Sequence, residues 1–274
     1  MGSLMPKGKS QNSPDLAAWI DSRQSQGLYF FHRHEALKTL SVSEIAFKKA
    51  AARLSRKKRI ARIHRGFFII IPLEYAYTGV LPAEWFIADL MRYMGQPYYV
   101  GLLSASALHG AAHQQPQQFH VVTTGPLREI QTNGLAIAFF SKTKFAGVQV
   151  TKIKVQTGYI RVSTPEATAI DLIRYAKRIG GVDRVFTVLQ ELGEAMDLEK
   201  LVLAVKADGR IAYAQRLGFL LERAGFSDLT YGLSQWAQER KPLPARLEPS
   251  MPAAGCKKDQ RWKILVNIDV EGDL

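Results

Sequence analysis

The N-terminal fold is decided by residues 41–72, which read SVSEIAFKKAAARLSRKKRIARIHRGFFIIIP. Ser43 is a favourable N-cap, and the helical spacing of the apolar residues after it predicts a helix that ends near Ser55. One face of this helix is expected to pack inward, while the other carries basic side chains. The inward face is predicted to consist of Ala46, Ala50 and Leu54, with Phe47 and Ala51 beside them.

A β-hairpin is predicted directly after this helix. Residues 60–63 and 67–71 are rich in β-branched and aromatic side chains, as strands are. The turn between them is predicted to be His64-Arg65-Gly66, where the glycine suits a positive φ. Because proline cannot donate to a sheet, Pro72 is expected to end the second strand.

Two shorter helices are expected before residue 41. The first is predicted to begin at Ser13-Pro14 and to end at Gly27, and the second to run from His34 to Leu40. A tight connection then leads into the long helix. Two helices joined by such a turn and followed by a hairpin indicate a winged helix-turn-helix, which we place in residues 1–82.

The positive charge of the chain is concentrated in this N-terminal part. The net charge is +13, and residues 1–75 hold 14 Lys and Arg against 5 Asp and Glu. Residues 43–66 contain nine basic residues and one acid, Glu44. Such a run can be merely a solvated face, but cations on a helix-turn-helix also neutralise DNA phosphates and release counterions. Double-stranded DNA is therefore the expected partner.

The predicted DNA-binding residues lie on the long helix and on the hairpin. The major groove admits a helix whose side chains read base edges, while contacts to the backbone position the domain. The helix is expected to present Ser43, Lys48, Lys49 and Arg53 to the major groove. The hairpin is expected to contribute Arg62, His64 and Arg65. A winged helix can also bind proteins without binding DNA, and this alternative stays open.

Residues 83–274 are predicted to form a mixed α+β domain. Helices are predicted at residues 84–94, 103–109, 165–179, 182–192, 198–205 and 212–224. Strands are predicted at residues 98–100, 118–124, 135–140, 148–155, 159–163 and 262–270. The proline-containing residues 241–260 are expected to be an extended loop.

Three motifs stand out in this C-terminal part. Residues 103–110 read LSASALHG, residues 163–172 read STPEATAIDL, and residues 216–222 read RLGFLLE. Together with the hairpin segment 54–72, and in this order, they resemble the AbiEi family of antitoxins from type IV abortive-infection systems.

The resemblance implies a DNA-binding autorepressor that is also an antitoxin. Such antitoxins repress their own operon by binding inverted repeats through the winged helix. Their C-terminal domain counteracts a nucleotidyltransferase-like toxin without forming a stable complex with it. Two alternatives remain: a regulator of other genes whose C-terminal domain senses a signal or dimerises, and a nuclease that the winged helix directs to DNA.

No catalytic motif is found, so no enzymatic activity, cofactor or metal is expected. The sequence has no Walker loop, no Rossmann glycine fingerprint and no zinc-type cysteine pattern. Glu166 and Asp171 could hold a metal in a nuclease-like site. The favoured interpretation is structural: Glu166 would complete a capping box with Ser163, and Asp171 would pair with Arg174 or with a neighbouring strand.

The chain is expected to be cytoplasmic, without a membrane partner. Its one cysteine, Cys256, suits a reducing compartment. No apolar run approaches the ~18 residues of a membrane span. The first residues also lack the apolar stretch of a secretion signal.

Overall fold

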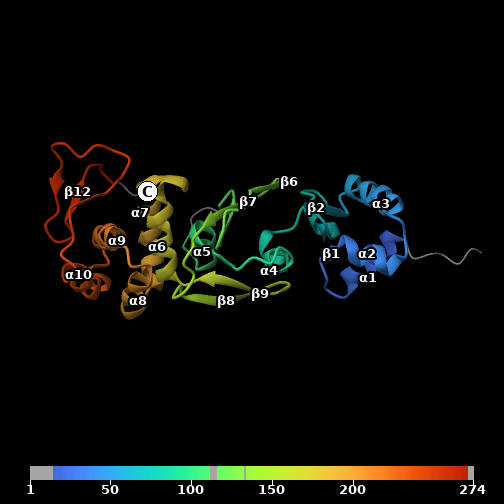
Figure 1. Ribbon diagram of the computed structural model, residues 1–274, viewed down its shortest axis with the longest axis horizontal. Helices are drawn as coiled ribbons and strands as arrows, with labels where there is room; N and C mark the ends of the chain where they lie inside the picture. Colours follow the sequence, from blue (N-terminus) through green and yellow to red (C-terminus); the bar gives the residue numbers. More distant parts are fainter. Residues whose placement is uncertain (1–14, 112–115, 133, 271–274) are drawn as a thin grey trace, which may run out of the picture. The chain divides into compact units, whose positions relative to one another are not determined.

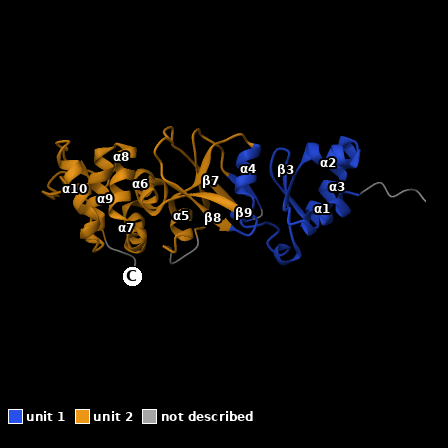
Figure 2. Ribbon diagram, turned by 90° about the horizontal axis from the view of Figure 1, so that it is seen from below, with its two compact units in different colours: residues 1–93, 130–135, 155–158 blue, residues 94–129, 136–154, 159–274 orange. Residues whose placement is uncertain are grey.

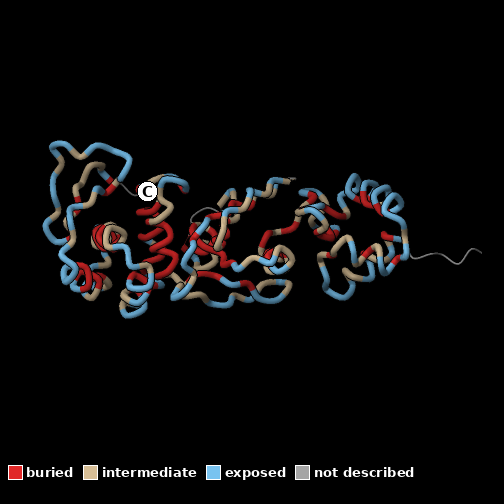
Figure 3. The backbone as a smooth tube through the Cα atoms, in the orientation of Figure 1, coloured by how far each residue is buried: buried red, intermediate tan, exposed pale blue. Residues whose placement is uncertain are grey.

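The computed structural model describes residues 15–111, 116–132 and 134–270. The chain divides into two compact units, coloured separately in Figure 2. Unit 1 comprises residues 1–93, 130–135 and 155–158, and unit 2 comprises residues 94–129, 136–154 and 159–274. Figure 3 shows buried backbone in both. Helices and strands occur together in each unit, which confirms the predicted α+β class.

Unit 1 contains the predicted three helices and hairpin (Figure 1). Its helices are α1 (Leu16–Ser25), α2 (Arg33–Leu40) and α3 (Glu44–Arg56). Its three-stranded sheet contains β1 (Phe30–His32), β2 (Ile60–His64) and β3 (Phe67–Ile70), in the antiparallel order β1-β3-β2. Strand β1, which lies directly before α2, was not predicted. The predicted helix start at Ser13-Pro14 lies outside the described residues.

Local signals place α3 and the hairpin turn where the sequence predicts them. The Ser43 hydroxyl accepts a hydrogen bond from the backbone N–H of Ala46 at 3.2 Å, so Ser43 is the N-cap. Gly66 has a φ of 80°, and a Cβ atom there would lie 2.5 Å from the Tyr93 hydroxyl. That hydroxyl donates to the carbonyl oxygen of Arg65 at 3.0 Å. The turn therefore requires glycine both for its backbone conformation and for the closeness of Tyr93.

The rotation of α3 differs from the prediction by about one residue. The buried stripe is Phe47, Ala51 and Leu54, whereas Ala46 is exposed. The Phe47 ring packs edge-on against Phe68 of β3, with the ring centroids 5.8 Å apart. Because burying an aromatic ring removes far more apolar surface from water than burying a methyl group, Phe47 rather than Ala46 decides which face turns inward.

The predicted helix at 84–94 is divided in two. A 3-10 turn (Ala83–Trp85) comes first, and α4 (Ile87–Tyr93) follows. Phe86 between them has a φ of −135° and is fully buried, so the chain leaves helical geometry there to seat the ring. Another 3-10 turn (Leu73–Tyr75) precedes this region.

The sheet that supports unit 2 has mixed strand directions. Its strands are β4 (Tyr98–Val100), β5 (Phe119–Thr123), β6 (Ile130–Thr132), β7 (Leu135–Ser141), β8 (Val150–Val155) and β9 (Gly158–Ser163). The strand order is β6-β7-β5-β4-β9-β8. Strand β4 runs antiparallel to β5 and parallel to β9, and β5 runs parallel to β7. The short strand β6, which was not predicted, is grouped with unit 1.

Helix α6 is the centre of the helical part of unit 2. The helices of this unit are α5 (Leu102–Leu108), α6 (Pro165–Tyr175), α7 (Gly181–Leu192), α8 (Leu198–Asp208), α9 (Ile211–Arg223) and α10 (Tyr231–Gln238). Helix α6 contacts α5, α7, α8 and α9, and all its residues from 166 to 173 are buried. A helix surrounded in this way is apolar on most faces, so its buried polar groups need partners.

The C-terminal segment corrects the sequence prediction. A short sheet joins β10 (Ala245–Arg246), β11 (Lys257–Lys258) and β12 (Ile264–Val266), in the order β10-β12-β11. The strand predicted at 262–270 is thus only three residues long. Trp262 serves as a core residue, 1% exposed, with its ring directly against Gly218 of α9. Helix α10, which packs against α8 and α9, was also not predicted.

Candidate functional site

The outer face of α3 carries the two lysines that were predicted to face DNA. Lys48 and Lys49 are exposed and form no ion pair with any residue that the structure describes. Arg56, in the last turn, is exposed as well. Their charges are therefore available to a polyanion.

Other basic residues of unit 1 are neutralised within the fold. Arg53, predicted to contact DNA, lies 3.6 Å from the carboxylate of Asp15, and both side chains are more than half exposed. Exposed ion pairs contribute little stability, so Arg53 can exchange Asp15 for a phosphate at small cost. Arg33 pairs with Glu44 and Arg59 with Asp21.

The remaining predicted residues have different environments. Ser43 is exposed, but its hydroxyl is occupied as the N-cap of α3. Arg62 is exposed on β2, and Arg65 is exposed in the hairpin turn. His64 is half-buried, with its ring 6.4 Å from that of Tyr93.

Ile45 was missed by sequence reasoning. It is the second residue of α3 and is 68% exposed, although it is large and apolar. Its position opposite the Phe47–Ala51–Leu54 stripe becomes evident only once the rotation of the helix is known. The signal in the sequence was an isoleucine that does not fit the helical spacing of the inward-facing apolar residues.

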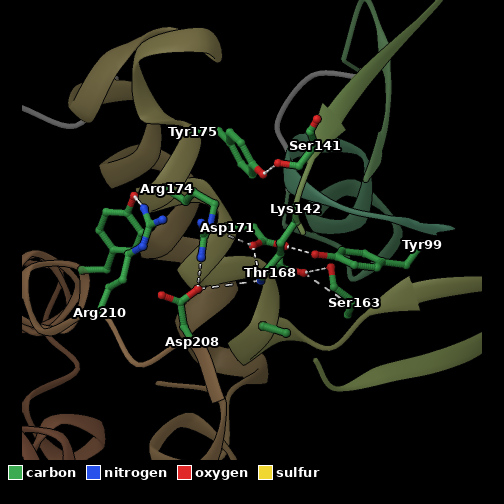
Figure 4. Close-up of polar contacts among 12 residues, drawn as sticks. Tyr99, Ser141, Lys142, Ser163, Thr168, Asp171, Arg174, Tyr175, Asp208 and Arg210 are labelled. Atoms are coloured by element: carbon green, nitrogen blue, oxygen red, sulfur yellow. Dashed lines mark hydrogen bonds and ion pairs between the residues drawn. The ribbon is translucent and has the colours of Figure 1, made fainter. Parts of the chain in front are cut away.

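Unit 2 contains a buried cluster of charged side chains around α6. Figure 4 shows Tyr99, Lys142 and Asp208 around Asp171. Asp171 is fully buried and accepts hydrogen bonds from the Tyr99 hydroxyl at 2.6 Å and from the Lys142 ammonium at 2.8 Å. Lys142, just after β7, is itself only 6% exposed. The expectation that Asp171 pairs with a neighbouring strand is confirmed, since Tyr99 lies in β4.

A second carboxylate extends the cluster to α8. Asp208 forms an ion pair with Arg174 and lies 3.9 Å from the Lys142 ammonium. Burial acts to lower the pKa of Arg174, but the hydrogen bond and charge of Asp208, together with Asp171, raise it overall. Burial and the Asp171 charge raise the pKa of the Tyr99 hydroxyl, so it stays a hydrogen-bond donor. The same two causes raise the pKa of Tyr175 to about 12.

Glu166 has a structural role, although not the predicted one. The N-cap of α6 is Thr164, whose hydroxyl accepts from the N–H of Ala167 at 3.4 Å, so Ser163 and Glu166 do not form a capping box. Glu166 is 2% exposed and accepts from the backbone N–H of Asp197 at 2.9 Å. The Ser163 hydroxyl instead lies 2.6 Å from that of Thr168.

A pocket of about 330 Å³ lies beside the charged cluster. Residues after β7, with parts of α6 and α8, form its walls, and Lys142, Arg174 and Asp208 are among them. The lining side chains include three buried polar atoms without a hydrogen-bond partner, which are Asp208 Oδ1, Gln149 Oε1 and Arg174 Nε. Because native proteins rarely leave buried polar atoms unsatisfied, this pocket is chemically distinctive.

Residues 99–223 match the family model of the AbiEi antitoxin C-terminal domain. The match supports assignment of this part of the chain to the AbiEi antitoxin family. The AbiEi domain thus begins at Tyr99 and contains the whole charged cluster, with Lys142, Asp171, Arg174 and Asp208. The match supports an antitoxin role in a type IV toxin–antitoxin system, and such a role implies a toxin as partner.

The fold is shared with a solved structure. The RV2827C protein from Mycobacterium tuberculosis superposes with a TM-score of 0.64 at 13% sequence identity, covering 90% of this chain and 89% of that one. At this identity the likeness concerns the fold alone. No curated protein matches the chain.

Two further properties concern the described residues. No helix there has the length and apolarity needed to cross a membrane. In the same residues, no group of three His, Cys, Asp or Glu side chains could hold a metal ion.

His120 is expected to make the stability of unit 2 dependent on pH. It is 5% exposed in β5, and burial, with the nearby Arg178 charge, lowers its pKa from 6.5 to about 4. In the unfolded chain the His120 imidazole is protonated below pH 6.5, whereas in the folded chain it is protonated only below about pH 4. The contribution of this group, about 3 kcal/mol, is therefore present at neutral pH and is lost as the pH falls through that window.

Urea unfolding at pH 7 and pH 4 measures this effect. Between pH 7 and pH 4, the free energy of unfolding should fall by about 3 kcal/mol less in His120→Gln than in the unmodified protein. Identical pH dependence in His120→Gln and the unmodified protein would show that His120 is protonated in the fold.

Proposed function

We propose that this protein binds double-stranded DNA through a winged helix-turn-helix in residues 1–82 and represses its own operon from inverted repeats. Residues 83–274, which include the AbiEi domain, counteract a nucleotidyltransferase-like toxin in the cytoplasm without a stable complex. The observation that carries the DNA-binding proposal is the pair Lys48 and Lys49 on α3, which are exposed and form no ion pair with a described residue. The family match carries the antitoxin proposal.

The order of elements in unit 1 supports this docking mode. Helices α2 and α3 enclose a short turn, and the β2–β3 hairpin follows α3 directly. In such domains the second helix enters the major groove with its N-terminal residues against base edges. Arg62 and Arg65 on the hairpin are then free to contact phosphates, which fix the orientation of the domain.

Inverted repeats require two copies of the reading helix. A dimer or two monomers bound side by side can supply them, and in both cases the spacing of the half-sites reflects the distance between the two α3 helices.

Binding to the DNA upstream of the gene for this protein tests the repressor proposal. The full-length protein is titrated against that duplex and a shuffled one at several salt concentrations. We expect clear preference for the natural duplex, with affinity that falls steeply as salt rises. Equal, weak binding to both would contradict the proposal and favour the regulator of other genes.

Growth protection tests the antitoxin proposal. The proposal requires a toxin of the nucleotidyltransferase type: cells that express this toxin should stop growing, and co-expression of the full-length chain should restore growth. Co-purification should recover no stable complex of the two proteins. Growth arrest that persists despite abundant folded antitoxin would refute this half of the proposal.

Ile45 is expected to contribute to sequence preference rather than to general affinity. An exposed apolar side chain at the start of a recognition helix suits the methyl group of thymine. Ile45→Ala should therefore weaken binding to the natural duplex by about 5- to 30-fold while leaving binding to the shuffled duplex unchanged. Leu203, 54% exposed in α8, provides the matched control: Leu203→Ala should change binding to neither the natural nor the shuffled duplex. Unaltered preference in Ile45→Ala would place Ile45 outside the interface.

A further inference from the structure

We propose that the pocket in the AbiEi domain binds a nucleotide. This site lies wholly within unit 2, so the proposal does not depend on DNA binding by α3. Its volume of about 330 Å³ is at the lower end of the range for small-molecule pockets, which is ~300–1,000 Å³.

The charge of the pocket selects an anion. Four cationic side chains line it, which are Lys142, Lys144, Arg174 and Arg210, whereas Asp208 is the one anionic side chain among its lining residues. Asp171 neutralises part of this charge through Lys142. Lys144 and Arg210 are exposed, so their charges lie where the pocket opens to solvent. A phosphate group is the anion that lysine and arginine recognise best together.

Two buried acceptors in the pocket suit a ligand that also donates hydrogen bonds. Asp208 is 3% exposed in its side chain, and its Oδ1 atom has no hydrogen-bond partner among the described residues. Gln149 Oε1 is a second buried acceptor without a partner. A ligand with N–H or O–H groups would donate to both acceptors. A nucleobase or ribose supplies such donors, and inorganic phosphate supplies far fewer.

The rest of the lining suits a flat organic group. Val148, Ala204 and Ala207 provide small apolar surface beside the polar atoms. Arg174 Nε remains as a donor for a ring nitrogen or carbonyl oxygen of the base. We therefore place the base and sugar near Asp208 and Gln149, and the phosphates near Lys144 and Arg210.

Calorimetric titration of the full-length protein tests the site. The probes are ATP, GTP, CTP and UTP, with ribose 5-phosphate and inorganic phosphate for comparison. At least one nucleotide should bind with a Kd below about 1 mM, and tighter than both comparison compounds. The Lys144→Ala, Arg210→Ala double variant should weaken binding at least about tenfold, because two charge-assisted contacts are lost. Gln149→Leu, similar in size but without the acceptor, should also weaken it.

Two control variants separate this pocket from other basic surfaces. Lys152→Ala removes an exposed charge from β8, and the Lys48→Ala, Lys49→Ala variant removes the charge of α3, so neither should change nucleotide binding. Each variant is first shown to melt at the temperature of the unmodified protein. Failure of every nucleotide to bind, equal binding of inorganic phosphate, or binding that depends on Lys48 and Lys49 but not on the pocket would each overturn the proposal. None of these results would bear on operator preference or growth protection.

Discussion

Replacing Asp171 with Ala is expected to lower the free energy of unfolding by about 3–5 kcal/mol. The carboxylate is fully buried and joins Lys142 and Tyr99, which come from separate segments of the sheet. Without it, the buried Lys142 ammonium keeps only Asp208, 3.9 Å away, and the Tyr99 hydroxyl loses its acceptor. The cost comes from the uncompensated groups left behind, more than from the strength of the original pair.

Urea unfolding followed by circular dichroism measures this loss. Asp183→Ala is the matched control, because Asp183 is exposed in the first turn of α7, and it should cost no more than about 1 kcal/mol. A double variant, Asp171→Leu with Lys142→Met, should recover much of the lost stability, because it removes both buried charges. A cost below about 1 kcal/mol for Asp171→Ala would mean that water reaches the cluster.

The Lys48→Ala, Lys49→Ala double variant is expected to weaken binding to the upstream DNA by about 100-fold at low salt. Both lysines are exposed and without described ion pairs, so the substitution should leave the fold intact. If each contacts one phosphate, the slope of log affinity against log salt should also fall by about 2. Titrations of both proteins at several salt concentrations give both quantities.

The control for this variant removes the same charge elsewhere. Lys152 and Lys154 are exposed on β8, and their double replacement by Ala should leave DNA affinity nearly unchanged. Equal losses in the two double variants would show that net charge alone drives binding. Unchanged affinity in the α3 variant would refute the placement of the recognition helix.

Local signals in the sequence suffice where a residue acts on its own backbone neighbourhood. Ser43 caps α3, and Gly66 permits the hairpin turn, because capping and φ preferences are properties of a few adjacent residues. Exposure of Lys48 and Lys49 also followed from the sequence, since charged side chains avoid burial without a partner.

The prediction from sequence failed where a side chain's position depends on contacts between segments that are distant in the chain. The contact between the rings of Phe47 and Phe68 fixes the rotation of α3, and with it the exposure of Ile45. The pairing of Arg53 with Asp15 likewise depends on how α1 lies against α3. Neither contact leaves a periodic pattern in the sequence.

The sequence by itself determined the α+β class, most helices and strands, and the basic outer face of α3, because hydrophobic spacing, caps and charge act over one or two turns. Tertiary structure alone decided the buried cluster, which joins Tyr99, Lys142, Asp171 and Asp208 across more than a hundred residues of chain. A buried charge is tolerated only where the fold brings its partners within hydrogen-bonding distance, and those partners come from distant strands and helices. The pocket beside the cluster exists for the same reason.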